Sequence, residues 1–238
     1  MKNTIDNVSG DKVLGTLKDF CEKMQSGAIP WDSWQVFRNL SKDQHRLLSQ
    51  RGNPFLQPRS QSSQKEIWQE IYARYFGIES IDISLIMGKT DRWSVYIHEG
   101  LTMNRVLDVW RNFFEFKVYG GNLDAEVTHN DRTSEKSYGI SVASNMEADP
   151  EFANMSEDDL VEIGHVGITL LERMVLEVYY FHTTGKHLDI ENFTLCIGSR
   201  NANGFVPFVD CRSGVVCVDW CHPSYAYSYF RSRAVVSE

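Results

Sequence analysis

Apolar residues recur at helical spacing in the first third of the chain. One stripe lies between residues 11 and 26, and a shorter one follows Pro30. Residues 41–44 have the form of a capping box, and residues 51–64 form a breaker segment with prolines and serines. A further helix is expected from about residue 64 to 76, with Gly77 as its C-cap. The pattern predicts a helical region over residues 1–78.

Two later stretches resemble each other. The sequences HEGLT at 98–102 and HVGIT at 165–169 each precede a long amphipathic helical pattern, and each pattern ends in Gly-x-x-Leu-Asp, at 120–124 and 185–189. Thr102 and Thr169 are the expected N-caps, and Thr169 forms a capping box with Glu172. We therefore predict a tandem duplication with units at residues 79–150 and 151–238, which together form one domain.

Strand patterns surround these helices. Residues 93–98 predict a strand, whereas residues 80–89 fit no single pattern. In the first unit, strands are expected at 125–128 and 138–143. In the second they are expected at 192–198, 205–210 and 215–220, with turns at 201–204 and 212–214. Pro207 indicates an edge strand or a bulge, and the doubly apolar strand at 215–220 belongs inside the sheet. The predicted fold class is α+β, with a helical N-terminal part followed by two helix-plus-antiparallel-strand units.

Composition and charge narrow the functional classes. The 238 residues are 42% hydrophobic and 12% aromatic, which indicates a chain with a packed core. The formal net charge is −8 and no cluster of Lys and Arg is visible, so nucleic-acid binding is disfavoured. No apolar run is long enough to span a membrane, and the N-terminus lacks a hydrophobic signal core. The expected location is the cytoplasm.

The cysteines raise the question of a metal. Five Cys at irregular spacing make a poor disulfide framework, which fits reduced cytoplasmic thiols. Cys211, Cys217, Cys221 and His222, with Cys196 upstream, fit zinc spacing only loosely. Buried cysteines that act as small apolar residues explain the pattern better. We therefore expect no metal and no cofactor.

Four polar residues in the second unit form a candidate polar site: Arg200, Asp210, Asp219 and His222. Arg200 lies beside a Gly/Asn turn that could bind an anion through backbone N–H groups, and paired carboxylates can do acid–base work or hold Mg²⁺. The alternatives are a plain hairpin turn, and carboxylates that face solvent or pair with Arg231 or Arg233. His98 and His165, which precede helix N-termini, could act as bases or simply bond locally.

An aromatic run near the C-terminus is the candidate interface. It consists of Tyr225, Tyr227, Tyr229 and Phe230. Tyrosine is enriched in interfaces because its rigid ring carries a polar tip. The alternative is a C-terminal helix whose aromatic residues pack over the sheet.

The second unit resembles a known module. Its pattern is HLDIENFTLCIGSR at 187–200, VPFV at 206–209, VCVDW at 216–220 and RSRAVVS at 231–237. It is similar to the C-terminal module of uncharacterised proteins predicted from small-genome, uncultured bacteria, over roughly residues 157–238. The resemblance implies a bacterial-type origin and a recurring module, and it implies no chemistry.

These observations favour a non-enzymatic interaction or structural protein. The absence of catalytic spacing, the many aromatic residues and the repeated unit all point this way, with self-association or a protein partner as its mode of action. The alternative is a small-ligand-binding protein or enzyme with a polar site on the second unit's sheet. That alternative requires Arg200, Asp210, Asp219 and His222 to converge in one pocket.

Overall fold

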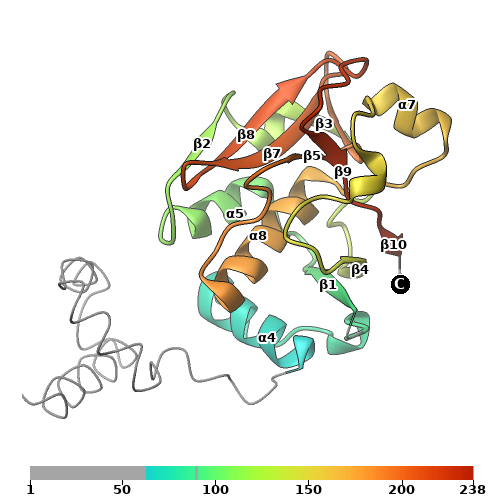
Figure 1. Cartoon of the computed structure of the whole chain (residues 1–238). Helices are drawn as coiled ribbons and strands as arrows, with labels where there is room; N and C mark the ends of the chain where they lie inside the picture. The colour runs from blue at the N-terminus through green and yellow to red at the C-terminus, as the bar shows by residue number, and fades with distance from the viewer. Residues whose placement is uncertain (1–62, 89–90, 238) are drawn as a thin grey trace, which may run out of the picture. The chain divides into compact units, whose positions relative to one another are not determined.

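The computed structural model describes residues 63–88 and 91–237 (Figure 1). The helices predicted between residues 11 and 40 and the capping box at 41–44 lie outside these ranges. Residues 62–238 form one compact unit. It contains helices and mixed sheets, so the predicted α+β class is confirmed.

In the part of the chain that the structure describes, the helical elements are short, with one exception. They are α4 (Gln64–Ile71), a π-helical turn (Tyr72–Phe76), a 3-10 turn (Ile83–Leu85), α5 (Met103–Trp110), α6 (Leu123–Glu126), a 3-10 turn (Pro150–Phe152), α7 (Glu157–Glu162) and the 15-residue α8 (Leu170–Thr184). In the described ranges no helix is both long and apolar enough to cross a bilayer.

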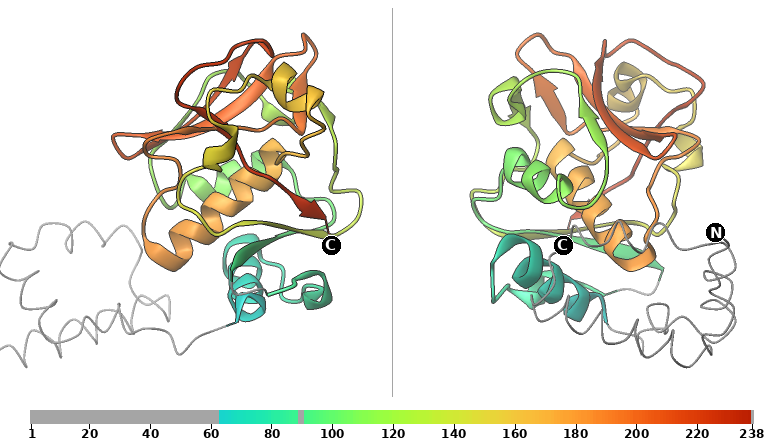
Figure 2. Two further views of the ribbon diagram at one scale, coloured as in Figure 1. Left: turned by 45° about the vertical axis from the view of Figure 1, so that its right-hand side comes forward. Right: turned by 90° about the vertical axis from the view of Figure 1, so that its left-hand side faces the viewer.

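The strands within residues 63–88 and 91–237 form three sheets. The first has the order β1 (Arg92–Ile97), β4 (Tyr138–Ala143), β10 (Val236–Ser237). The second has the order β2 (Phe116–Val118), β8 (Val215–Cys221), β7 (Val206–Arg212), β5 (Phe193–Leu195), β9 (Phe230–Ser232). The third pairs β3 (Val127–Asn130) with β6 (Ser199–Asn201). Helix α8 lies between the first two sheets and packs against both β1 and β7 (Figures 1 and 2).

The sequence explains why α8 is the central helix. Its residues from Leu170 to Tyr180 are all buried, as expected for a helix that is covered on every side. The predicted capping box of Thr169 and Glu172 is present, and Gly185 ends the helix in the left-handed conformation at φ 67°. Trp68 of α4 stacks on Tyr179 with ring centroids 5.0 Å apart, so α4 shares the main core with α8.

The first copy of the helical pattern departs from its prediction. Helix α5 begins after the expected N-cap, Thr102, but has only eight residues and is followed by strand β2. The Asn112 side chain donates to the Asp108 carbonyl at 3.0 Å, which satisfies an acceptor at the helix end. The chain then turns so that Phe114 and Phe116 pack on Trp110.

The two Leu-Asp pairs nevertheless act alike. Leu123 and Leu188 are fully buried. Asp124 accepts from the backbone N–H of Met103 at 2.8 Å, at the start of α5. Asp189 accepts from Arg173, in the first turns of α8, at 2.9 Å. This similarity is local, and the tandem duplication itself is not confirmed.

Most strands of the second unit lie where they were predicted, and β8 is an interior strand as expected. The expectation for Pro207 is corrected, because β7 lies between β8 and β5 rather than at an edge. Pro207 needs no N–H there. Its carbonyl accepts from Cys196 at 2.9 Å, on the side away from β8, and β5 ends at Leu195.

Candidate functional site

The five-stranded sheet has two different faces. Its inner face, with Val209 and Val218, belongs to the main core around α8. Its outer face carries a second, smaller apolar cluster that includes Phe208 and Phe230. Phe193 of β5 extends this cluster, with its ring stacked on Phe208 at 5.5 Å and 9°. The outer cluster forms the base on which the segment after β8 rests.

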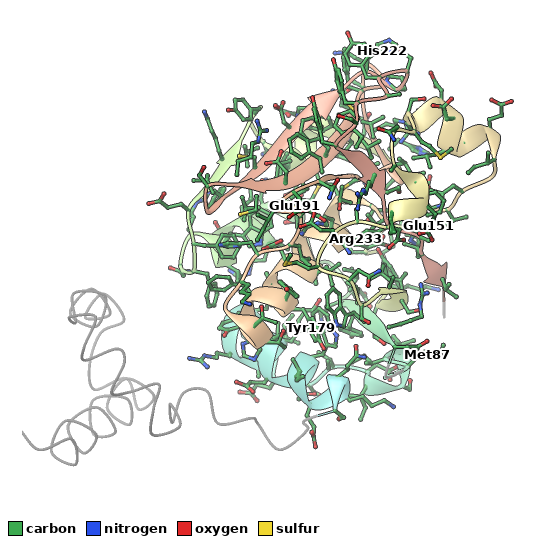
Figure 3. All side chains as sticks on the ribbon, in the orientation of Figure 1. Met87, Glu151, Tyr179, Glu191, His222 and Arg233 are labelled. Atoms are coloured by element: carbon green, nitrogen blue, oxygen red, sulfur yellow. The ribbon has the colours of Figure 1, made fainter. Side chains whose placement is uncertain are left out.

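That segment, residues 222–229, is fixed at both ends. The Pro223 carbonyl accepts from the backbone N–H of Asp158 in α7 at 3.1 Å. The Tyr229 carbonyl accepts from Phe193 at 2.8 Å, which joins the segment to β5. The His222 imidazole bonds the Ser224 hydroxyl at 2.8 Å. These bonds hold the segment in one conformation. In Figure 3 its first residue, His222, lies far from Tyr179 of the central helix α8.

The segment and Phe205, which precedes β7, present a continuous row of rings. We call this row the aromatic strip, and it consists of Phe205, His222, Tyr225, Tyr227 and Tyr229. Successive ring centroids lie 5.9, 5.6, 5.6 and 5.3 Å apart in that order. The last pair is nearly parallel, at 17°. Tyr229 also contacts Phe193 at 4.4 Å, which ties the strip to the outer cluster.

The strip faces solvent. The exposed fractions are 49% for Tyr225, 43% for Tyr227 and 38% for Tyr229, whereas Phe230 is only 1% exposed. Phe230 thus anchors the strip rather than belonging to its surface. The alternative of a packed C-terminal helix is wrong, because the described residues after β8 form turns and short strands. Partial burial, followed by the neighbouring Tyr227, raises the pKa of Tyr229.

Charged residues flank the strip unequally. At its Pro223 end lies the first turn of α7, with Glu157, Asp158 and Asp159. Asp158 is exposed, and Glu157 pairs with Arg200. At the Tyr229 end, Arg212 lies over the Phe193 ring at 4.9 Å and pairs with Asp210. Arg200 and Arg212 are therefore neutralised, while the exposed carboxylate of Asp158 remains near one end of the strip.

The four residues of the candidate polar site each have a separate partner. Arg200 binds Glu157, Asp210 binds Arg212 in two contacts of 2.9 Å, Asp219 accepts from the backbone of Trp220, and His222 bonds Ser224. In the described part of the chain no hydrogen bond or ion pair joins two of the four. Burial raises the pKa of Asp210, and the hydrogen bond from Arg212 opposes this effect.

The proposed pairing of Asp210 or Asp219 with Arg231 or Arg233 is corrected. Arg233 is fully buried and donates to Asp189 at 2.6 Å, while Asp210 pairs with Arg212. Asp189 also accepts from Arg173, which donates to Glu177 at 2.7 Å. This buried charge network links α8 to the C-terminal segment. Sequence reasoning missed it, although three charges inside the apolar pattern of α8 were a visible signal.

A shallow depression of about 470 Å³ lies over residues 132–140. Beneath it, Arg132 donates to the buried Glu172 at 2.6 and 2.9 Å, and the Tyr138 hydroxyl donates to the same carboxylate at 3.0 Å. Burial, together with the charge of Glu172, raises the pKa of Tyr138. Because Glu172 is also bonded to the Thr169 backbone, these groups satisfy one another and stabilise the start of α8.

The histidines singled out from the sequence have local partners. His165 contacts the Ser232 hydroxyl at 2.9 Å, but Ser232 is fully buried, so its oxygen cannot reach a substrate. His98 contacts the Tyr96 hydroxyl at 3.2 Å. In neither place does the geometry provide an accessible nucleophile.

The cysteines of the described region are free and buried: Cys196, Cys211, Cys217 and Cys221. Burial raises the pKa of Cys211 to about 11 and that of Cys221 to about 12. Both thiols are therefore protonated at neutral pH. Within the described ranges no group of three or more Cys, His, Asp or Glu could hold a metal ion.

No family model, curated protein or solved structure matches the chain. The resemblance of residues 157–238 to a bacterial module therefore stays a prediction. The aromatic strip is the most exposed apolar feature of the described sheet surface that the sequence also singled out.

Proposed function

We propose that the protein is a non-enzymatic interaction protein that binds a partner through the aromatic strip. The observation that carries this proposal is a row of exposed tyrosine rings on a segment bonded at both ends. Large rings are common at the centres of binding surfaces, where they bury much area for little loss of side-chain freedom. Because the segment is already ordered, binding costs little additional conformational entropy.

The partner can be another protein or a second copy of the chain. We also propose a cytoplasmic location, which the free cysteines Cys196, Cys211, Cys217 and Cys221 support. The alternative, a small-ligand site at Arg200, Asp210, Asp219 and His222, is less favoured. Each of those side chains is already engaged by its own neighbour.

The test compares two double variants of the full chain. Tyr227→Ala with Tyr229→Ala truncates the strip. Val161→Ala with Ile163→Ala is the matched control, because it truncates side chains that are 56% and 60% exposed near the end of α7. Light scattering over a concentration series reports self-association, and quantitative affinity capture from extracts of the producing cells reports other partners.

We expect the strip variant to lose the association and the control variant to keep it. Thermal unfolding of both variants shows whether they remain folded. A strictly monomeric protein with no captured partner would contradict the proposal. Equal association by the strip variant and the wild type would contradict it as well.

A further inference from the structure

We propose that the strip recognises an extended, proline-rich segment that carries basic residues. This inference rests on the proposed function and names the class of its partner. The recognised conformation is the polyproline II helix, which aromatic-lined surfaces bind in several unrelated folds.

The spacing of the rings fits such a ligand. The centroids of Tyr225, Tyr227 and Tyr229 are separated by 5.6 and 5.3 Å, so the row spans at most about 11 Å. One turn of a polyproline II helix covers roughly 9 Å, with three residues per turn. The row is therefore about as long as one turn, so two ligand residues three positions apart, which share one face of the helix, can contact its two ends. The backbone of such a helix makes no internal hydrogen bonds, so its carbonyls are free to accept from the phenol groups.

The charges near the strip favour basic residues in the ligand. Asp158 is exposed at the Pro223 end of the strip, and Asp219 is half-buried on the neighbouring strand β8. Arg200 and Arg212 are paired with Glu157 and Asp210. The chain as a whole carries a net charge of −8. Complementary charge therefore favours Lys or Arg in the ligand, next to its prolines.

Two other ligand classes fit less well. Single-stranded nucleic acid also stacks on aromatic rings, but it requires a positive groove for its phosphates, and the arginines here are neutralised. A saccharide would need a broad flat face. Tyr225 and Tyr227 are inclined to each other at 67°, so the strip does not form such a face.

Fluorescence polarisation tests the inference with the full chain and synthetic probes. The main probe is a fluorescein-labelled peptide of four Lys-Pro-Pro repeats. Matched probes replace Pro by Ala or Lys by Glu, and labelled oligothymidine and a labelled oligosaccharide represent the competing classes. The protein variants are Tyr227→Ala, Asp158→Asn and the control Ile163→Ala.

We expect saturable binding of the Lys-Pro-Pro peptide that weakens at least tenfold with Tyr227→Ala. Asp158→Asn should weaken it about threefold and make it less sensitive to salt. Ile163→Ala should leave it unchanged, and the Ala and Glu probes should bind at least tenfold more weakly.

If the Lys-Pro-Pro peptide did not bind, or if oligothymidine or the oligosaccharide bound more tightly, the inference would be overturned. If the peptide failed while the strip variant still lost its association in the capture experiment, the proposed function would stand and only the partner class would be wrong.

Discussion

The Trp68 indole N–H donates to the Ser94 carbonyl at 2.8 Å, and both groups are buried. It belongs to a row of side-chain hydrogen bonds along the outer edge of β1. Gln64 exchanges hydrogen bonds with Ser94 and Arg92 at 2.7 Å, and the Tyr72 hydroxyl donates to Tyr96 at 2.7 Å. The three side chains are four residues apart on one face of α4 and its π-helical extension. Helix side chains thus close the edge of the first sheet where another strand would otherwise pair.

Removal of the Tyr72 hydroxyl tests this edge closure. Tyr72→Phe keeps the ring but leaves the buried Tyr96 carbonyl without its donor. We expect a loss of about 1–3 kcal/mol in the free energy of unfolding, measured by urea denaturation. The control Tyr225→Phe changes an exposed phenol and should stay within about 0.5 kcal/mol of the wild type. Equal stabilities for the two variants would show that the edge bond contributes nothing.

Asp189 should be the most sensitive member of the buried charge network. Asp189→Asn removes the negative charge between Arg173 and Arg233, which are both fully buried. Asn tolerates the positive φ of 54° at this position, so the change isolates the charge. We expect a loss of about 3–5 kcal/mol, because uncompensated buried charge remains.

The matched control for that variant is Asp210→Asn. Its partner, Arg212, has a side chain that is 52% exposed and can return to water. Asp210→Asn should therefore lower the free energy of unfolding clearly less than Asp189→Asn in the same denaturation experiment. A larger loss from Asp210→Asn than from Asp189→Asn would contradict the account of the network.

His165 should make stability depend on pH. Burial lowers its pKa below the usual 6.5, an effect that Glu151 partly opposes. Between the lowered pKa and about 6.5 the unfolded state binds more protons than the folded state. The stability that neutral His165 contributes is therefore complete above pH 6.5 and is lost as the pH falls. We expect His165→Gln to show a smaller loss of stability than the wild type between about pH 7 and pH 5. If the free energy of unfolding depended on pH identically in the variant and the wild type, His165 would not contribute to the pH dependence.

Local signals in the sequence predicted much of this fold. Thr169 with Glu172, Gly185, strand β4 and strand β8 follow from capping, turn chemistry and apolar alternation, which act within a few residues. The end of α5 could not be read this way. It depends on the packing of Phe114 and Phe116 around Trp110, and helix propensity continued past that point.

The sequence also could not predict the long-range pairings, because local signals act only within a few residues. Arg233 reaches Asp189, and Arg132 reaches Glu172, across large separations in the chain. Periodicity carries no information on such partners. The tyrosine run was visible in the sequence, but its exposure depends on Phe230, which is buried and holds the segment against the outer cluster.

Site-specific photo-cross-linking tests whether the aromatic strip binds a partner. A benzophenone side chain placed at Tyr227 samples the strip, and one placed at Ile163 samples an exposed apolar position outside it. The full chain carrying either probe is irradiated in the producing cells, and the adducts are identified by mass spectrometry. We expect a discrete adduct, with a partner or a second copy, from position 227 and none from position 163. Adducts from position 163 alone, or from neither position, would contradict the proposal.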